Sequence, residues 1–239
     1  MKKFFDLFFE TISFLTILPV KKTSQNLGYK MFIFFPFVGL VIGVICFCLC
    51  ILLKKIFSVE ISAFLVLFFY ILLSDYLHLD GFVDTVDALF SCLKKNYIDT
   101  LKDPHIGVVG GIYLFMVLLM KYFLFLENNK VVYILTPVFS KTGLVIVGFF
   151  GRKLTDGIGE KFLHKNFFIA IFCLLFCSVL FLFILQNFLY SLIFVLLCFL
   201  SSFIITSFFN IKFGGINGDV FGFANEALEI LFLTLFRFC

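Results

Sequence analysis

Residues 167–209 read FFIAIFCLLFCSVLFLFILQNFLYSLIFVLLCFLSSFIITSFF, two uncharged and mostly apolar runs separated by Gln186 and Asn187. Each run has about the 20 residues that an α-helix needs to cross the hydrocarbon core of a bilayer. The whole chain shares this character, because 62% of its residues are hydrophobic, 14% are charged and the mean hydropathy is +1.15. Such values lie outside the range of soluble domains, so the sequence predicts an integral membrane protein.

Further apolar runs of similar length surround this pair of helices. They lie near 31–53, 61–79, 106–126 and 131–151, with a shorter run near 227–238. The sequence therefore predicts an all-α, polytopic helix bundle with six to seven transmembrane helices, forming a single catalytic domain over residues 1–239. Asp6 and Glu10 interrupt the N-terminal apolar segment, which we expect to form an interfacial or re-entrant helix rather than a span.

The positions of Lys and Arg predict the orientation of the bundle. With the N-terminal segment and alternate loops on one side, that side holds Lys2, Lys3, Lys21, Lys22, Lys30, Lys94, Lys95, Lys102, Arg152, Lys153, Lys161, Lys165 and Lys212. The opposite side holds only Lys54, Lys55 and Lys130. Positive residues favour the cytoplasmic side, so we expect the N terminus and the loops at 80–105 and 210–226 to face the cytoplasm.

An acidic motif follows one of the apolar runs. Residues 77–89 read LHLDGFVDTVDAL, in which Asp80, Asp84 and Asp87 are spaced i, i+4, i+7. At about 100° per residue, Asp84 and Asp87 lie within about 40° of Asp80 around a helix axis. Three carboxylates on one face repel one another, which favours a hard divalent cation with oxygen ligands. The alternative is a solvated helix face beside the membrane.

A second acidic segment, GGINGDVFGFANEALEI, occupies residues 214–230. Asp219 and Glu226 are i, i+7 and share a helical face, while the preceding glycines, including Gly218, allow a ligand to approach the backbone. A glycine turn followed by an amphipathic helix with solvated acids is an equally simple interpretation.

Two lysines and an irregular segment complete the polar features. In LKDPHIGVVGG, residues 101–111, Pro104 keeps Asp103 out of helical geometry and leaves Lys102 at the membrane surface. The glycines there, including Gly107, serve either a ligand or helix packing in lipid. Lys141 lies inside a span, so we expect it to reach an acid, a phosphate or a polar cavity, unless it snorkels to an interface.

Cysteine does not indicate a metal centre or a disulfide framework. None of the eight cysteines forms a CxxC pair, and six of them fall within the apolar runs. We therefore expect them to act as small core residues.

The motifs together resemble one family. The sequences FLTILPV (14–20), FPFVGLVIG (35–43), LHLDGFVDTVDAL (77–89), LKDPHIGVVGG (101–111) and GGINGDVFG (214–222) are similar, in order, to those of cobalamin synthases, the adenosylcobinamide-GDP ribazoletransferases. This chain departs from the family pattern before the histidine, where it has Ser74, Asp75 and Tyr76, and at Pro104, where a serine is usual.

The resemblance implies a membrane transferase that joins adenosylcobinamide-GDP and α-ribazole, or its 5′-phosphate. The ribazole 3′-hydroxyl would attack the phosphate attached to cobinamide and release GMP, in the final assembly step of cobalamin biosynthesis. Phosphoryl transfer of this kind requires neutralisation of the pyrophosphate, placement of the hydroxyl and removal of its proton.

The resemblance also implies residue roles. The expected Mg²⁺ ligands are Asp80, Asp84 and Asp87, with Asp103 and Asp219 completing the shell. Asp84 or Asp87 would act as the base, by likeness to CDP-alcohol phosphotransferases, or His78 would accept the proton or bind the nucleotide; a hydrogen-bonded structural histidine is the alternative. The expected substrate-binding residues are Lys102, Lys141, Gly81, Gly107, Gly218 and Glu226.

The expected partners are small-molecule substrates and the lipid bilayer, with no nucleic acid. The resemblance places the enzyme in the bacterial cytoplasmic (inner) membrane, with its active site facing the cytoplasm. A homo-oligomer or an association with other enzymes of the cobalamin pathway stays open.

Two other functions remain as alternatives. A CDP-alcohol phosphatidyltransferase would carry Ala-Arg after its Asp-Gly pair, where this chain has Phe82 and Val83. An ion or metal transporter would line its path with intramembrane charges such as Lys121 and Lys141, and would place its acids near mid-membrane.

Overall fold

The computed structural model describes residues 2–20, 28–91 and 107–238. Their helices are α1 (Lys2–Leu15), η1 (Tyr29–Phe34), α2 (Phe35–Leu53), α3 (Val59–Tyr70), η2 (Ile71–Asp75), α4 (Tyr76–Ser91), α6 (Val108–Glu127), α7 (Val132–Phe150), η3 (Gly159–Phe162), α8 (Phe167–Leu185), α9 (Phe188–Lys212) and α10 (Gly218–Phe236). Apart from one isolated bridge between Lys153 and Ile216, every regular element in these ranges is a helix, which confirms the predicted class.

Within the described ranges, five helical segments are long and apolar enough to cross a membrane: Tyr29–Leu53, Val108–Glu127, Val132–Phe150, Phe167–Leu185 and Phe188–Lys212. A sixth span is possible only if α3 and α4, which meet at an 87° bend, are counted as one. The predicted span at 61–79 is therefore broken by the π-helical turn η2. The short span predicted near 227–238 was wrong, because α10 begins at Gly218 and carries buried charged residues that keep it out of this group.

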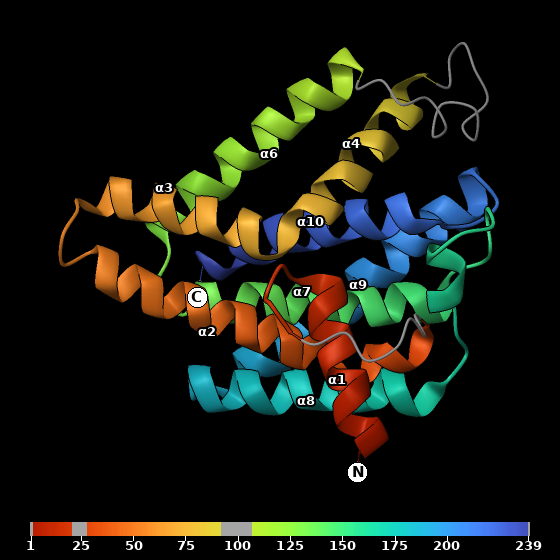
Figure 1. Ribbon diagram of the computed structural model, residues 1–239, viewed down its shortest axis with the longest axis horizontal. Helices are drawn as coiled ribbons and strands as arrows, with labels where there is room; N and C mark the ends of the chain where they lie inside the picture. The colour runs from red at the N-terminus through yellow and green to blue at the C-terminus, as the bar shows by residue number, and fades with distance from the viewer. Residues whose placement is uncertain (1, 21–27, 92–106, 239) are drawn as a thin grey trace.

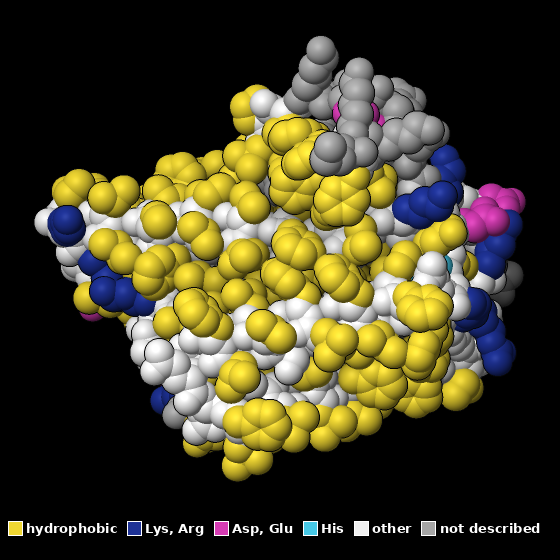
Figure 2. All heavy atoms as spheres, turned by 90° about the horizontal axis from the view of Figure 1, so that it is seen from below, with side chains coloured by type: hydrophobic (Ala, Val, Ile, Leu, Met, Phe, Trp, Pro, Cys, Tyr) yellow, Lys and Arg dark blue, Asp and Glu magenta, His cyan; other side chains and the backbone are white. Residues whose placement is uncertain are grey.

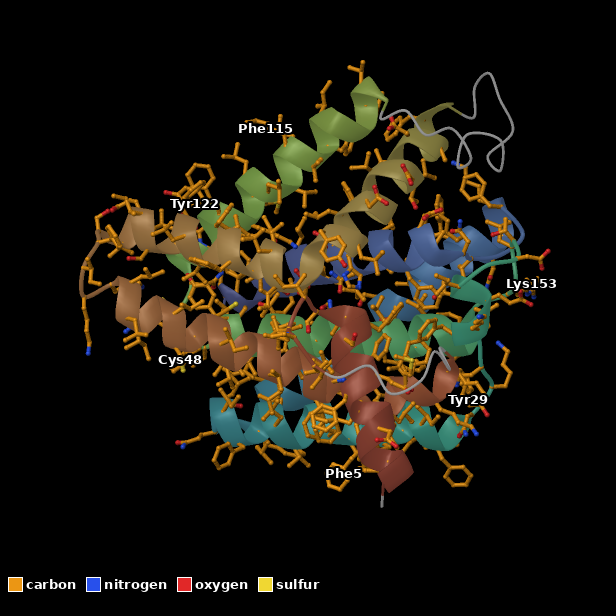
Figure 3. All side chains as sticks on the ribbon, in the orientation of Figure 1. Phe5, Tyr29, Cys48, Phe115, Tyr122 and Lys153 are labelled. Carbon is orange, nitrogen blue, oxygen red and sulfur yellow. The ribbon has the colours of Figure 1, made fainter. Side chains whose placement is uncertain are left out.

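The outer surface has the distribution expected of a membrane protein. Figure 2 shows one face largely covered by hydrophobic side chains, with Lys and Arg gathered towards its two ends. Phe5 and Phe115, on α1 and α6, point outwards and are 56% and 62% exposed (Figure 3). Exposed side chains of this size stabilise the protein only when lipid covers them.

The helix α7 forms the centre of the bundle, and nearly all of its residues are buried. The helix α2 packs closely along it through Gly39 and Gly43. A Cβ atom on Gly43 would lie 2.6 Å from the Cα atom of Ile134, so only glycine allows this approach. Two glycines one turn apart thereby join α2 to α7.

Asparagine side chains define where three of the helices begin. The Oδ1 atom of Asn166 accepts hydrogen bonds from backbone amides at the start of α8, and Asn187 and Asn217 do the same for α9 and α10. Between α8 and α9, Gln186 adopts a left-handed conformation with φ of 52°. This residue completes the turn that makes α8 and α9 an antiparallel pair (Figure 1).

Basic residues mark the two ends of the bundle unequally. Lys30, Arg152, Lys161, Lys165 and Lys212 lie at the end where α7 and α9 finish and α8 begins (Figure 1). Lys54, Lys55 and Lys130 lie at the opposite end, in the turns after α2 and α6. The helix α1 runs across the direction of α2 and α8, as an interfacial helix would (Figure 1).

Candidate active site

A cavity of about 450 Å³ opens at the end of the bundle that carries most of the described basic residues. Its walls come from the end of α1, the junction of η1 and α2, the beginning of α4, Leu144 of α7, the segment Thr155–Glu160 with Phe162, and the beginning of α10. Six separate parts of the chain thus converge on one space, and both acidic motifs contribute to it.

Close packing of α4 against α10 brings the two acidic motifs together. A Cβ atom on Gly81 would lie 2.8 Å from the Cα atom of Asp219, and one on Gly222 would lie 2.6 Å from the carbonyl oxygen of His78. Neither position tolerates a side chain without separating the helices. Gly81 therefore acts in helix packing as well as in lining the cavity.

Four carboxylates line the cavity: Asp80, Asp156, Glu160 and Asp219. The Oδ2 atom of Asp219 accepts a hydrogen bond of 2.7 Å from the side chain of Asn217, the residue that caps α10. Burial raises the pKa of Asp219 and the nearby charge of Asp80 raises it further, while the Asn217 hydrogen bond opposes both. Asp80 and Asp219, both predicted as metal ligands, thus line the same cavity. Gly218, which the sequence predicted to bind substrate, lines the same cavity, and a Cβ atom added to it would meet nothing within 4 Å.

The other two aspartates of the first motif lie farther along α4 and do not line the cavity. Asp84 is half-buried and interacts electrostatically with Asp80, Asp87 and Asp219. Asp87 is buried, and its two carboxylate oxygens accept hydrogen bonds of 2.7 and 2.8 Å from the amides of Gly107 and Gly110.

Asp87 therefore caps the first turn of α6, where free amides and the helix dipole favour a negative charge. Gly107, predicted to bind substrate, donates one of these hydrogen bonds instead. The sequence contained a signal for this contact, because the glycines at 107 and 110 leave room for a carboxylate beside the helix start.

The metal-binding prediction is supported by the type of side chain at the cavity and not by an arrangement of ligands around one point. In the described ranges, no group of three or more His, Cys, Asp or Glu side chains is placed to hold a metal ion. Asp103 and Lys102 lie outside the described residues. The oxygen donors of Asp80 and Asp219 fit a hard divalent cation, provided that substrate oxygens, water or further carboxylates complete its coordination.

His78 lies on the cavity wall and is 5% exposed. Its Nδ1 atom is 3.1 Å from the carbonyl oxygen of Ser74. A carbonyl oxygen only accepts hydrogen bonds, so Nδ1 carries the proton and Nε2 of the neutral ring is the acceptor. The predicted structural hydrogen bond is therefore present, and it leaves Nε2 as the proton acceptor.

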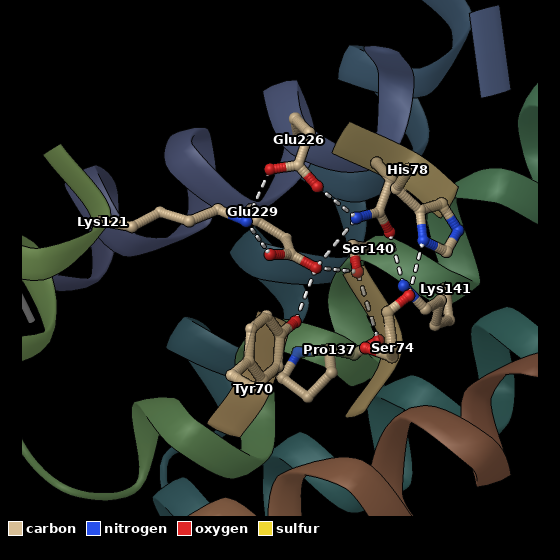
Figure 4. A network of polar contacts seen from close by, with 10 residues as sticks. Tyr70, Ser74, His78, Lys121, Pro137, Ser140, Lys141, Glu226 and Glu229 are labelled. Carbon is tan, nitrogen blue, oxygen red and sulfur yellow. Dashed lines mark hydrogen bonds and ion pairs between the residues drawn. The ribbon is translucent and has the colours of Figure 1, made fainter. Parts of the chain in front are cut away.

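Lys121, Glu226 and Glu229 belong to a buried polar network and do not line the cavity (Figure 4). The ammonium group of Lys121 is 2.6 Å from Glu226 and 2.7 Å from Glu229, and all three side chains are fully buried. Tyr70 and Ser140 donate hydrogen bonds of 2.6 and 3.0 Å to Glu229. These contacts join α3, α6, α7 and α10 at one point.

Lys141 belongs to the same network. Its ammonium group donates a hydrogen bond of 2.7 Å to Asn225, whose own amide donates to Glu226 and Glu229. Lys141 is fully buried, so it reaches a polar interior as expected and does not snorkel. Lys141 and Glu226, both predicted to bind substrate, are engaged with protein groups and do not line the cavity.

Sequence reasoning missed several parts of the site. Glu229 is three residues after Glu226 and shares its helical face, and the buried Lys121 needed an acidic partner, so this pair was detectable. The segment Thr155–Glu160 had no such signal, because its place at the cavity depends on Gly159 packing against the backbone of Gly218.

Comparisons with known proteins agree with the resemblance seen in the motifs. The model of the cobalamin-5-phosphate synthase family matches residues 7–237. An adenosylcobinamide-GDP ribazoletransferase of Thermodesulfovibrio yellowstonii is 31% identical over 96% of this chain and 95% of its own. Proteins of the same name from Clostridium kluyveri and Treponema denticola are 31% and 33% identical, over 98% and 86% of this chain and 97% and 86% of their own.

No solved structure matches the chain. The family match covers almost every described helix, and the similarity to the relatives extends over most of both chains. The chain belongs to the cobalamin-5-phosphate synthase family.

Proposed function

We propose that this protein is an adenosylcobinamide-GDP ribazoletransferase, which joins adenosylcobinamide-GDP to α-ribazole or its 5′-phosphate and releases GMP. The similarity to three proteins of that name over most of their length carries the proposal. The convergence of both acidic motifs on one cavity supports it, because phosphoryl transfer needs oxygen ligands beside the reacting phosphates.

The reaction forms one bond and breaks another at a single phosphorus atom. The 3′-hydroxyl oxygen of α-ribazole bonds to the phosphorus attached to cobinamide, and the bond from that phosphorus to the bridging oxygen breaks. GMP leaves with the bonding electron pair, and the hydroxyl proton passes to a base of the protein. Alignment of the three atoms is a large part of such catalysis.

We assign the role of general base to Asp84. It is half-buried among other carboxylates, which favours binding of a proton. Asp87 is less suited, because both of its oxygens already accept hydrogen bonds from the start of α6. His78 is the second candidate, through Nε2, since Nδ1 is committed to Ser74.

Asp80 and Asp219 would hold Mg²⁺, the cofactor that the proposal includes, with Asp103 as a further carboxylate donor. When bound, the ion would offset the charge of the pyrophosphate and polarise its P–O bonds. Without a cation, the carboxylates at the cavity would repel the diphosphate substrate. This charge conflict is the reason for proposing that the enzyme depends on Mg²⁺.

The proposal also includes the inner membrane and a cytoplasmic site. The cavity opens at the end that carries Arg152, Lys153 and Lys161, and positive residues favour the cytoplasmic side. In this orientation, soluble nucleotide substrates would reach the acidic wall from the cytoplasm.

The direct test is GMP release and adenosylcobalamin formation by the purified protein in lipid, supplied with adenosylcobinamide-GDP and α-ribazole. We expect product from the wild type with Mg²⁺, loss of product on chelation, and recovery when Mg²⁺ is restored. A folded wild-type protein that forms no product would refute the transferase. Product that persists after chelation would refute the metal requirement alone.

A further inference from the structure

The cavity has two chemically different halves. The aromatic half consists of five phenylalanines from five different elements: Phe14, Phe32, Phe35, Phe162 and Phe221. The acidic half comes from the beginning of α4, the segment before η3, η3 itself and the beginning of α10. A ligand bound here would meet both aromatic carbon and carboxylate oxygen.

The aromatic half is rigidly built. The ring of Phe162 lies 5.1 Å from Phe14 in a stacked arrangement, 5.4 Å from Phe32 and 5.9 Å from Phe35. Phe32 and Phe35 are also in edge contact at 4.6 Å. Phe32, Phe35 and Phe162 are at most 4% exposed, so they present almost no ring surface to the cavity. They pack against Phe14 and Phe221, which are half-buried and line the cavity. The buried rings thus fix the two half-buried ones, and pre-organised rings bind a flat aromatic group with little loss of conformational entropy.

The charge of the lining favours a neutral ligand in this interior. Of the described residues that line the cavity, four are carboxylates and none is Lys or Arg. Lys153, which does not itself line the cavity, forms ion pairs of 2.5 and 2.6 Å with two of them, Asp156 and Glu160. A nucleoside diphosphate placed inside would still bring its negative charge against Asp80 and Asp219. The diphosphate is better placed outside the aromatic half, where a metal held by the carboxylates can reach it.

The size of the cavity selects between the two substrates. About 450 Å³ lies within the range of about 300–1,000 Å³ typical of sites for drug-sized molecules. A nucleoside such as α-ribazole fits such a volume. The corrinoid substrate, with its macrocycle, adenosyl group and GDP, is several times larger and must remain mostly outside.

We propose that this cavity is the binding site of α-ribazole, with the aromatic base against Phe14 and Phe221 and the ribose directed to Asp80 and Asp219. This inference rests on the proposed transferase function. It makes the aromatic half the part of the enzyme that selects the nucleoside base, and it leaves the corrinoid to bind beside the cavity opening.

The test measures KM for each substrate separately in Phe14→Leu. Stacking on an aromatic side chain contributes enough that its loss should raise the KM for α-ribazole about tenfold. The KM for adenosylcobinamide-GDP should stay within about twofold, since that substrate does not contact Phe14. The matched control is Phe8→Leu, which removes a half-buried ring from the same helix that does not line the cavity.

A second variant, designed to block the cavity, keeps the test decisive if Phe14→Leu fails to fold. Leu144 lines the cavity from α7, so Leu144→Phe should fill it and raise the KM for α-ribazole in the same selective way. Equilibrium dialysis should also show α-ribazole binding to the wild type alone, and weaker binding to either variant.

The outcomes separate the inference from the function on which it rests. If the wild type forms product but the variants raise the KM for adenosylcobinamide-GDP, or neither KM, the cavity does not hold α-ribazole. If the wild type forms no product and binds no α-ribazole, both fail. If it binds α-ribazole without forming product, the nucleoside site stands and the transferase function does not.

Discussion

Gly81 of α4 lies against the backbone of Asp219 of α10, so closely that a Cβ atom on Gly81 would be 2.8 Å from the Cα atom of Asp219. These residues belong to two acidic motifs that are far apart in the sequence. Their contact places Asp80 and Asp219 at one cavity, which is the arrangement on which the proposed chemistry depends.

The first prediction concerns this contact. Gly81→Ala inserts a methyl group against backbone, so the helices must separate, and we expect a loss of about 1–3 kcal/mol in stability. Activity should fall at least tenfold because the two carboxylates move apart. The control is Gly111→Ala on α6, where a Cβ atom meets nothing within 4 Å. Thermal unfolding in detergent and the GMP-release assay measure both effects; equal behaviour of the two variants would contradict the prediction.

Asp219→Asn should stabilise the protein while it abolishes activity. Burial and Asp80 raise the pKa of Asp219, so the folded chain holds this proton more tightly than the unfolded chain. The resulting stability is present below the ordinary aspartate pKa of about 3.9 and is lost as the pH rises through the raised value. A neutral amide at this position avoids that loss.

We therefore expect Asp219→Asn to melt roughly 2 °C above the wild type near neutral pH, with the difference vanishing in acid. Melting curves of both proteins across this pH range test the prediction. A lower melting temperature for the variant at neutral pH would show that the carboxylate stabilises the unliganded protein.

Asp84 and Asp87 should respond differently to the same change. Asp84→Asn removes the proposed base, and we expect activity to fall by about 100-fold or more, within the usual range for general bases. Asp87→Asn keeps only one of the two oxygens that accept hydrogen bonds from α6, so it should cost about 1–3 kcal/mol in stability while activity remains within about fivefold. Turnover of the two variants at saturating substrate decides the assignment, and the reverse ranking would make Asp87 the base.

The buried ion pairs predict a large effect on stability. Lys121→Met leaves Glu226 and Glu229 buried without their cation, which should cost about 3–5 kcal/mol. The control is Arg237→Ala, which breaks an exposed pair with Glu127 and should cost at most about 1 kcal/mol. Chemical unfolding of both variants provides the measurement, and a loss for Lys121→Met as small as that of the control would contradict it.

Two single substitutions at exposed lysines can show which side of the membrane the cavity faces. Lys130→Cys places a thiol in the turn after α6, and Lys161→Cys places one near the cavity. If the cavity faces the cytoplasm, a membrane-impermeant maleimide should label the first variant in intact cells and the second only after lysis. Labelling in the opposite order would reverse the orientation.

Most of the membrane architecture could be predicted from the sequence because hydropathy is a local property. The runs at 131–151, 167–185 and 188–209 differ from the observed helices by three residues at most. The prediction was wrong at 227–238, and at 61–79 it missed the bend between α3 and α4, which form a sixth span only if they are counted as one. There, a π-helical bend and a pair of buried glutamates depend on neighbouring helices that no local window includes.

The sequence by itself determined that the chain is an apolar helix bundle, that its acids are grouped in two motifs, and which family it resembles. Only the tertiary structure decided that Asp80 and Asp219 share a cavity while Asp87 caps α6. It also decided that Lys121 pairs with Glu229, 108 residues away. Periodicity places residues on a face of one helix, but the partner of that face depends on how bulky and small side chains fit between helices.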